Sequence, residues 1–200
     1  MDGVSWLEIV PSLALGIGLA ACAGLRAWLP LLLLGGLARW GVVDLSPSFE
    51  FVASTRALIL FGVATVVEIA GDKIPAVDHA LDALSTVLRP AAGSLLAASV
   101  LWQVSDPLTA MALGIAVGAP SALVPHAAKS TLRVVSTSFT GGLANPVLSL
   151  LEDALAFVLF VFTVVVPVLV ASLVLLAGFL VARRLLRRST PPTARTAAAP

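Results

Sequence analysis

The chain alternates between long apolar runs and short polar stretches. The apolar runs cover roughly residues 6–28, 54–70, 91–105, 107–128 and 154–182. A helix needs about 20 apolar residues to cross about 30 Å of hydrocarbon, and within one continuous run only a helix satisfies its own backbone groups. The pattern therefore predicts an all-α, polytopic helical membrane protein with about five transmembrane helices.

The first apolar region allows two interpretations. Trp6 and Trp28 lie about 33 Å apart along a helix. Because tryptophan favours the membrane–water interface, this pair predicts one span between them. Residues 29–40 then form a re-entrant or interfacial helical piece, after a break marked by Pro30. The alternative is one long tilted helix over residues 9–38.

Three later segments carry patterns of their own. Four apolar residues between Val77 and Leu88 recur at helical spacing, which predicts a short amphipathic helix in an interface or a cavity. Residues 129–146 are predicted to form a loop. Pro167 divides the last run, where we expect a kink within a single span.

The amino-acid composition restricts the chain to one class of protein. Of the 200 residues, 59% are hydrophobic and 12% are charged, and the mean hydropathy is +1.06. A typical soluble domain is about a quarter charged. These values exclude a soluble enzyme, a secreted disulfide scaffold, a nucleic-acid binder and a disordered chain. The net charge of +1 gives no reason to expect a polyanionic partner.

The basic residues predict how the chain sits in the cell (cytoplasmic) membrane. We expect one helical membrane domain over residues 1–182, followed by a basic stop-transfer segment and a disordered cytoplasmic tail over residues 183–200. The four clustered arginines of that segment place the C-terminus in the cytoplasm. Five crossings then put the N-terminus outside, and Arg26 is expected to reach the cytoplasmic headgroups.

An odd number of crossings has a consequence for the ionisable residues. The segments Glu68–Arg89 and His126–Asp153 fall on the same, external side of the membrane. Ionisable groups are costly in lipid unless they are paired or face water, so they are candidates for function. The candidates for a ligand site or an ion pathway are Arg26, Glu68, Asp72, Lys73, Asp78, His79, Asp82, Arg89, His126, Lys129, Arg133, Asn145, Glu152 and Asp153.

The first of these segments is acidic. Glu68 and Asp72 are four residues apart, as are Asp78 and Asp82, with His79 beside the second pair. Such a pattern fits a water-lined site for protons, or for a cation held by carboxylates and the histidine. The alternative is a solvated helix face with ion pairs. Zinc-type spacing is absent from the sequence, so whether a metal binds is left open.

The second segment is basic. His126, Lys129 and Arg133 are three and four residues apart, which stacks them on one helix face. Asn145 is a good N-cap for a new helix, and the amide groups of a helix N-terminus can hold an anion beside such cations. Alternatively, the acid pair at residues 152–153 neutralises the cations.

Other patterns point to packing rather than chemistry. Small residues recur every four positions at 16–24 and 110–122, which predicts close helix packing, with a homo-oligomer as the alternative. The serines and threonines near His126 do not follow the order of a catalytic triad or form a nucleophile elbow. An enzyme is therefore disfavoured, and no cofactor is expected.

Five motifs carry a family resemblance. The segments GLAACAGLRAWLPLLLLGGLARWG, EIAGDKIPAVDHALDAL, LRPAAGSLLAAS, HAAKSTLR and TGGLANPVLSLLEDALA occur in this order. Together they resemble the bacterial domain of unknown function 4126 family over roughly residues 14–160. The resemblance implies a small multi-span membrane protein, and it brings no established activity or ligand.

Three hypotheses for function follow. The first is a small transporter or channel-like protein with a charged cavity on the external side. The second is a membrane scaffold or assembly subunit, in which the charges are internal braces. The third is a membrane-embedded lipid-processing enzyme. The expected partners are the lipid bilayer, a small ion, solute or lipid ligand, and a second copy of the chain, but no nucleic acid.

Overall fold

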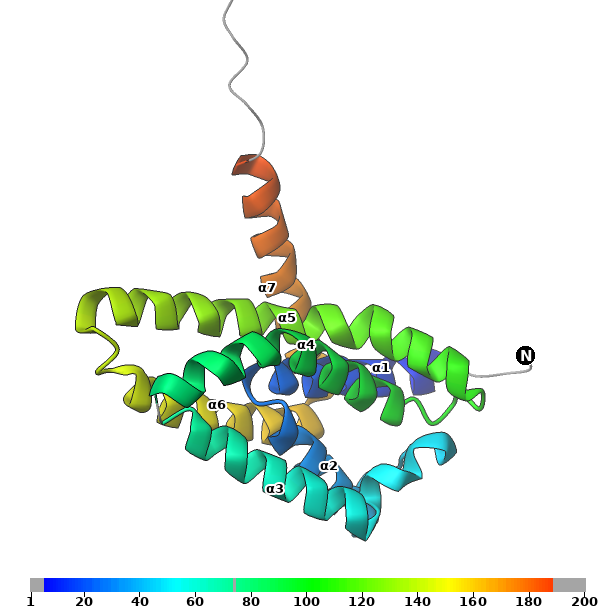
Figure 1. Cartoon of the computed structure of the whole chain (residues 1–200). Coiled ribbons are helices and arrows are strands. Elements are labelled where there is room, and N and C mark those ends of the chain that lie inside the picture. Colours follow the sequence, from blue (N-terminus) through cyan, green and yellow to red (C-terminus); the bar gives the residue numbers. More distant parts are fainter. Residues whose placement is uncertain (1–5, 74, 189–200) are drawn as a thin grey trace, which may run out of the picture.

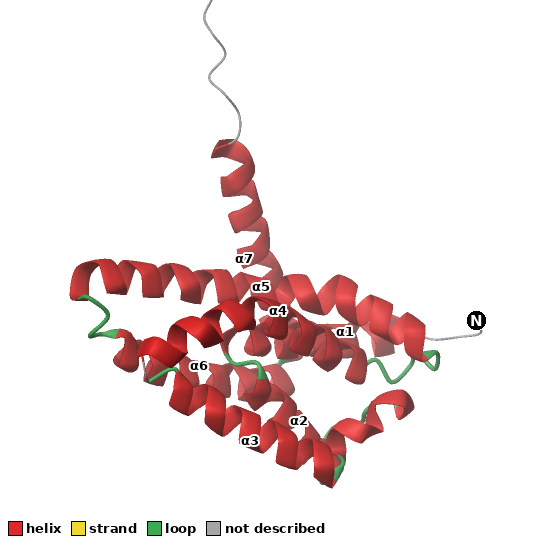
Figure 2. Ribbon diagram, in the orientation of Figure 1, coloured by secondary structure: helices red, strands yellow, loops and turns green. Residues whose placement is uncertain are grey.

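The computed structural model describes the backbone of residues 6–73 and 75–188, and the side chains of residues 9–73 and 84–186. Within these residues the regular structure is helical, and Figure 2 shows helices joined by short loops. The elements are α1 (Trp6–Leu25), α2 (Trp28–Arg39), the 3-10 helix η1 (Pro47–Ala53), α3 (Thr55–Gly71), α4 (Pro75–Ser99), α5 (Pro107–Thr140), α6 (Asn145–Val165) and α7 (Pro167–Arg188).

The core is built around α1, which packs against α4, α5, α6 and α7. Small residues let these backbones approach closely. A Cβ atom on Gly24 of α1 would lie 2.1 Å from the carbonyl oxygen of Ala122, and one on Gly118 of α5 would lie 2.3 Å from that of Gly93. Both distances are shorter than van der Waals contact, so no larger residue fits. The small-residue ridges thus serve packing within this chain.

The first apolar region is broken into two helices. α1 ends at Leu25 and α2 begins at Trp28, so the alternative of a single helix over residues 9–38 is wrong. The break precedes Pro30, which lies in the first turn of α2. Proline is tolerated there because the amides of a first turn have no helical partner.

Two predicted boundaries are wrong. The predicted amphipathic helix and the third apolar run form one helix, α4, which continues through Pro90. Likewise α5 continues through most of the predicted loop and ends at Thr140, before Gly141 with φ 60°. The cause is local. Hydroxyls in this polar stretch donate to backbone carbonyls four residues back, as Ser138 does to Val134 at 2.8 Å. Their hydrogen-bonding groups therefore find partners within the helix itself.

The last apolar run forms two helices rather than one kinked span. α6 ends at Val165 and α7 begins at Pro167. Proline removes a helical amide and disfavours the helical conformation of the preceding residue, and Val166 accordingly has φ −135°. In Figure 1, α7 (orange to red) leaves the body in which the other helices pack.

The described helices have the character of membrane spans. Three of them, α5, α6 and α7, are long and apolar enough to cross a membrane, and η1 with α3 makes a fourth if this pair, bent by 57°, counts as one span. α1 and α2 contribute shorter apolar helices. The all-α membrane fold is confirmed, with three or four helices of spanning length where the sequence predicted about five.

Candidate functional site

Charged residues that are far apart in the sequence meet where α1 gives way to α2. We call this cluster the ionic network. Its members come from the α1–α2 joint, from the end of α3, and from α4, α5 and α6, and all except Asp153 are buried. They are Arg26, Glu68, Asp72, Arg89, His126, Lys129, Arg133, Glu152 and Asp153.

Arg26 lies at the centre of the ionic network, with 0% of its surface exposed. Its guanidinium pairs with Asp72. Its Nε atom lies 2.6 Å from Oδ1 of Asp153, and Nη2 donates to the hydroxyl of Ser149 at 2.9 Å. The expectation that Arg26 reaches the headgroups is therefore wrong. Carboxylates from α6 and the end of α3 neutralise the guanidinium inside the bundle, so it does not need to reach water.

Asp72 is shared by several cations. Its Oδ2 atom accepts from Arg26, lies 3.4 Å from Nζ of Lys129, and lies 3.0 Å from Nη2 of Arg133. Asp72 is the C-cap residue of α3, whereas its partners belong to α5 and the α1–α2 joint. A single carboxylate therefore ties three separate elements together.

Glu152 of α6 neutralises the same two cations of α5 from the other side. Its Oε2 atom lies 2.9 Å from Nζ of Lys129. Arg133 donates to both oxygens, through Nε at 3.2 Å and Nη2 at 3.0 Å. Lys129 and Arg133 are thus neutralised by carboxylates, the second of the two arrangements that the sequence left open.

Asn145 takes no part in the ionic network. The N-cap of α6 is Ala144, without a side-chain capping bond, so the expected Asn145 cap is wrong. Instead the Asn145 side chain donates to the hydroxyl of Thr137 at 3.1 Å. Gly141 and Gly142 have positive φ and turn the chain sharply. This turn brings the asparagine against the last turns of α5.

An acid–base pair satisfies both ends of the break between α1 and α2. The carboxylate of Glu68 accepts from the amides of Ala27 and Trp28, at 3.1 and 3.3 Å. Arg89 donates to the carbonyl oxygen of Gly24 at 3.1 Å, and its Nη2 lies 3.9 Å from Oε1 of Glu68. Unsatisfied amides and carbonyls at helix ends favour a negative and a positive group, respectively. The sequence shows both residues but not this role.

His126 contacts Arg89 through a ring nitrogen, with 2.9 Å between Nδ1 of the histidine and Nη1 of the arginine. A guanidinium has donors only, so Nδ1 is the acceptor. The ring proton is then on Nε2, and His126 is neutral in this arrangement.

The ionic network has an exposed edge. Lys73 lies 3.8 Å from Oδ2 of Asp153, and these two side chains are 37% and 20% exposed. Asp78, His79 and Asp82 lie outside the described side chains. Among the residues that were searched, no group of three or more His, Cys, Asp or Glu residues could hold a metal.

One residue of the site was missed from the sequence. Ser149 is fully buried on α6 and accepts from Arg26. The available signal was its position, because Ser149 precedes Glu152 by three residues and therefore shares a helix face with it.

The charges in the ionic network balance. Among the described side chains of the network, and without the exposed Lys73 at its edge, four cations (Arg26, Arg89, Lys129 and Arg133) face four anions (Glu68, Asp72, Glu152 and Asp153). With His126 neutral, the sum is zero. Burial in a low dielectric requires such compensation, since an unpaired buried charge is strongly destabilising.

Apolar helices packed around a buried, charge-balanced polar cluster define an all-α protein of the multi-span membrane class. A family model described as a domain of unknown function, DUF4126, matches residues 13–188. The chain belongs to this family, and the match extends beyond residues 14–160, where the resemblance was found. No curated protein and no solved structure matches the chain.

Proposed function

We propose that this protein is a small membrane transport protein in which the ionic network forms the pathway for protons or a small ion. One observation carries the proposal: charged side chains from four α-helices (α3, α4, α5 and α6) and from the joint between α1 and α2 meet at a broken helix inside the bundle. Ionisable groups inside membrane proteins commonly mark ion pathways and proton relays. Broken helices are a recurrent way of building such sites in transporters.

Stability alone is a weak reason for such a network. Buried ion pairs often contribute no more to stability than apolar residues of similar volume, because removing the charges from water is costly. The network instead offers exchange of partners. Asp72 has three cationic partners. A proton or an incoming ion can therefore take the place of one partner at the Asp72 carboxylate while the other two partners stay in place.

Access to this pathway fits its exposed edge. Asp153 contacts the buried Arg26 with one oxygen and faces the half-exposed Lys73 with the other. The partly exposed carboxylate of Asp153 and the buried carboxylate of Asp72 therefore share the guanidinium of Arg26, so a proton or cation that binds Asp153 weakens one of the two pairs that hold Arg26.

The side of the membrane on which this edge lies depends on α6 and α7. The external position predicted from the sequence counted residues 154–182 as one crossing. If α6 and α7 each cross once, the network lies on the same side as the C-terminal arginines, which the positive-inside rule places in the cytoplasm. The cytoplasmic side is therefore the one that we adopt for the proposal.

Flux into liposomes tests the proposal. The purified full chain is reconstituted into vesicles loaded with indicators for protons, sodium, potassium or chloride. We expect flux of at least one of these ions above that of empty vesicles. It should be lost in Asp72→Asn and Glu152→Gln and kept in Glu50→Gln, a matched change at an exposed acid outside the network. Absence of flux for all four ions would overturn the proposal.

A second candidate is the membrane scaffold, which one observation favours: the network charges neutralise one another within the chain. In a scaffold the charges serve only as braces, so the wild type carries no flux of any of the four ions. Within the described side chains, no contact favours a lipid-processing enzyme.

A further inference from the structure

An apolar groove of about 440 Å³ lies between α2 and α6. This volume is within the range of about 300–1,000 Å³ that is typical of ligand sites. Its lining is apolar and includes Gly36 and Trp40 on the α2 side and Phe157, Val161 and Val165 on the α6 side. None of these residues belongs to the ionic network, so the groove is a separate feature of the molecule.

The groove is open toward the outside of the bundle. Phe157, Val161 and Val165 on its α6 wall are exposed. A Cβ atom added to Gly36 on the α2 wall would have no heavy atom within 4 Å, which shows that the protein's own side chains leave the space beside it unfilled. In a bilayer this face meets hydrocarbon, and hydrocarbon chains are the apolar material at hand to fill it.

One end of the groove is amphipathic and basic. Trp40 lines it and is 80% exposed, as expected of a tryptophan at a membrane–water interface. Two exposed arginines lie next to this end. Arg39 directly precedes Trp40 and donates to the hydroxyl of Thr55 at 2.8 Å, and Arg56 directly follows that threonine. The bond to Thr55 thus brings the end of α2, with Arg39, against the start of α3, with Arg56.

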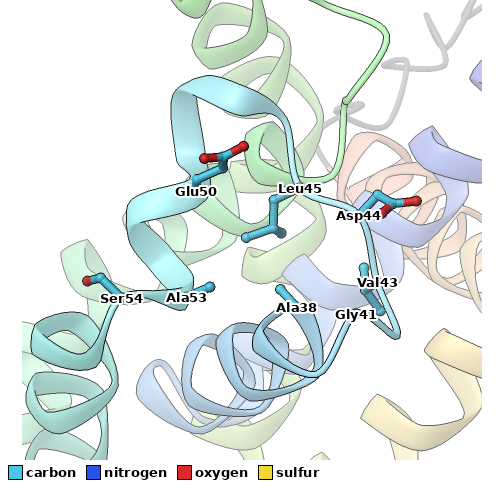
Figure 3. A pocket seen from close by; sticks show the side chains of 8 residues that line it. All are labelled: Ala38, Gly41, Val43, Asp44, Leu45, Glu50, Ala53 and Ser54. Atoms are coloured by element: carbon cyan, nitrogen blue, oxygen red, sulfur yellow. The ribbon is translucent and has the colours of Figure 1, made fainter.

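The acidic residues of this region belong to a different hollow. Asp44 and Glu50 line a pocket together with Ala38, Gly41 and other residues between α2 and η1, as Figure 3 shows. The two hollows share no lining residue. The groove end thus keeps a basic character.

We propose that the groove is a binding site for an anionic phospholipid. One acyl chain lies along Gly36 between α2 and α6, Trp40 lies at the level of the glycerol backbone, and the phosphate lies between Arg39 and Arg56. Apolar contact supplies the affinity for the chain, and the two arginines supply the preference for an anionic headgroup. This site is independent of the proposed transport function.

Lipid retention measured by native mass spectrometry tests this proposal. The full chain is stripped of lipid in detergent and then given equal amounts of phosphatidylglycerol and phosphatidylcholine with matched chains. We expect the wild type to retain one phosphatidylglycerol in preference to phosphatidylcholine. The Arg39→Gln/Arg56→Gln variant should lower this preference by about fivefold for each arginine. Gly36→Phe should lose both lipids.

Two matched controls make the result decisive. Arg183→Gln/Arg184→Gln removes the same charge from exposed positions on α7, and Leu173→Phe adds bulk at an exposed position there. Both controls should behave as the wild type. Equal retention of the two lipids by the wild type would overturn the proposal. It would also be overturned if the Gly36→Phe variant had the melting temperature of the wild type and still retained lipid. A lipid-free dimer that Gly36→Phe dissociates would instead make the groove an interface between two copies.

Discussion

Removing the carboxylate charge of Asp72 should destabilise the fold strongly. Asp72→Asn removes the one carboxylate that pairs with all three of Arg26, Lys129 and Arg133. The described network then carries an excess charge of one. Breaking a buried ion pair by removing one partner costs about 3–5 kcal/mol, because the remaining charge stays buried. We expect a loss of this size in the free energy of unfolding.

The same reasoning predicts a rescue. In Asp72→Asn/Lys129→Met the network is neutral again, and Arg133 still holds Glu152 through two hydrogen bonds. The double variant should therefore be more stable than the sum of the two single changes predicts, by about 0.5–3 kcal/mol, which is the usual range for residues in one network.

Equilibrium unfolding in detergent, with the two single variants and the double variant, measures this coupling. Glu50→Gln is the matched control, since it makes the same kind of change at an exposed acid and should fall within about 0.5 kcal/mol of the wild type. The reasoning is refuted if Asp72→Asn is as stable as Glu50→Gln. Additive losses in the double variant would also refute it.

Three further predictions follow from other parts of the fold. Gly118→Leu should abolish folded protein because a Cβ there would meet a backbone oxygen at 2.3 Å, whereas Gly36→Leu, at a position with open space, should fold; the yield of monodisperse protein measures both. Single cysteines at Ser138 and Thr193, in a chain without the native cysteine, should react with an impermeant thiol reagent from the same side, because α6 and α7 are each long and apolar enough to cross the membrane once; reaction from opposite sides would favour a single crossing by residues 154–182. Hydrogen bonds from the hydroxyl and amide three residues on hold the pKa of Asp106 below its ordinary value of 3.8. Its capping contribution is therefore full above that pH and lost as the pH falls through the lower folded value, so the melting difference between wild type and Asp106→Asn should be present at pH 7 and shrink toward pH 3.

Local patterns in the sequence predicted much of the helical framework. The run 54–70 became α3 almost residue for residue, and the proline at position 146 marked the start of α6 within one residue. Lys129 and Arg133 share a helix face and do contact the same two carboxylates, because a spacing of four residues fixes that geometry.

What the sequence could not predict depends on contacts between distant segments. The break after Leu25 is stabilised by Glu68 and Arg89, which are remote in sequence, whereas the local signal, Pro30, left one long helix open as the alternative. The span count predicts Arg26 and Asp72 on opposite sides of the membrane. One error in the number of helices reverses the side that is predicted for every later segment. The polarity of residues 129–140 predicts a loop, because polarity does not reveal that a hydroxyl will bond to its own helix.

The ionic network also sets an order of events during synthesis. Arg26 is made 46 residues before Asp72 and 123 residues before Ser149. At about 5–20 residues per second, the arginine waits roughly 2–9 s for its first carboxylate, and longer for α6. During that time the joint that follows α1 carries a cation without its carboxylate partners. The joint after the first helix therefore acquires its complete set of partners only when α6 is in place, which makes its assembly a late step although its synthesis is early.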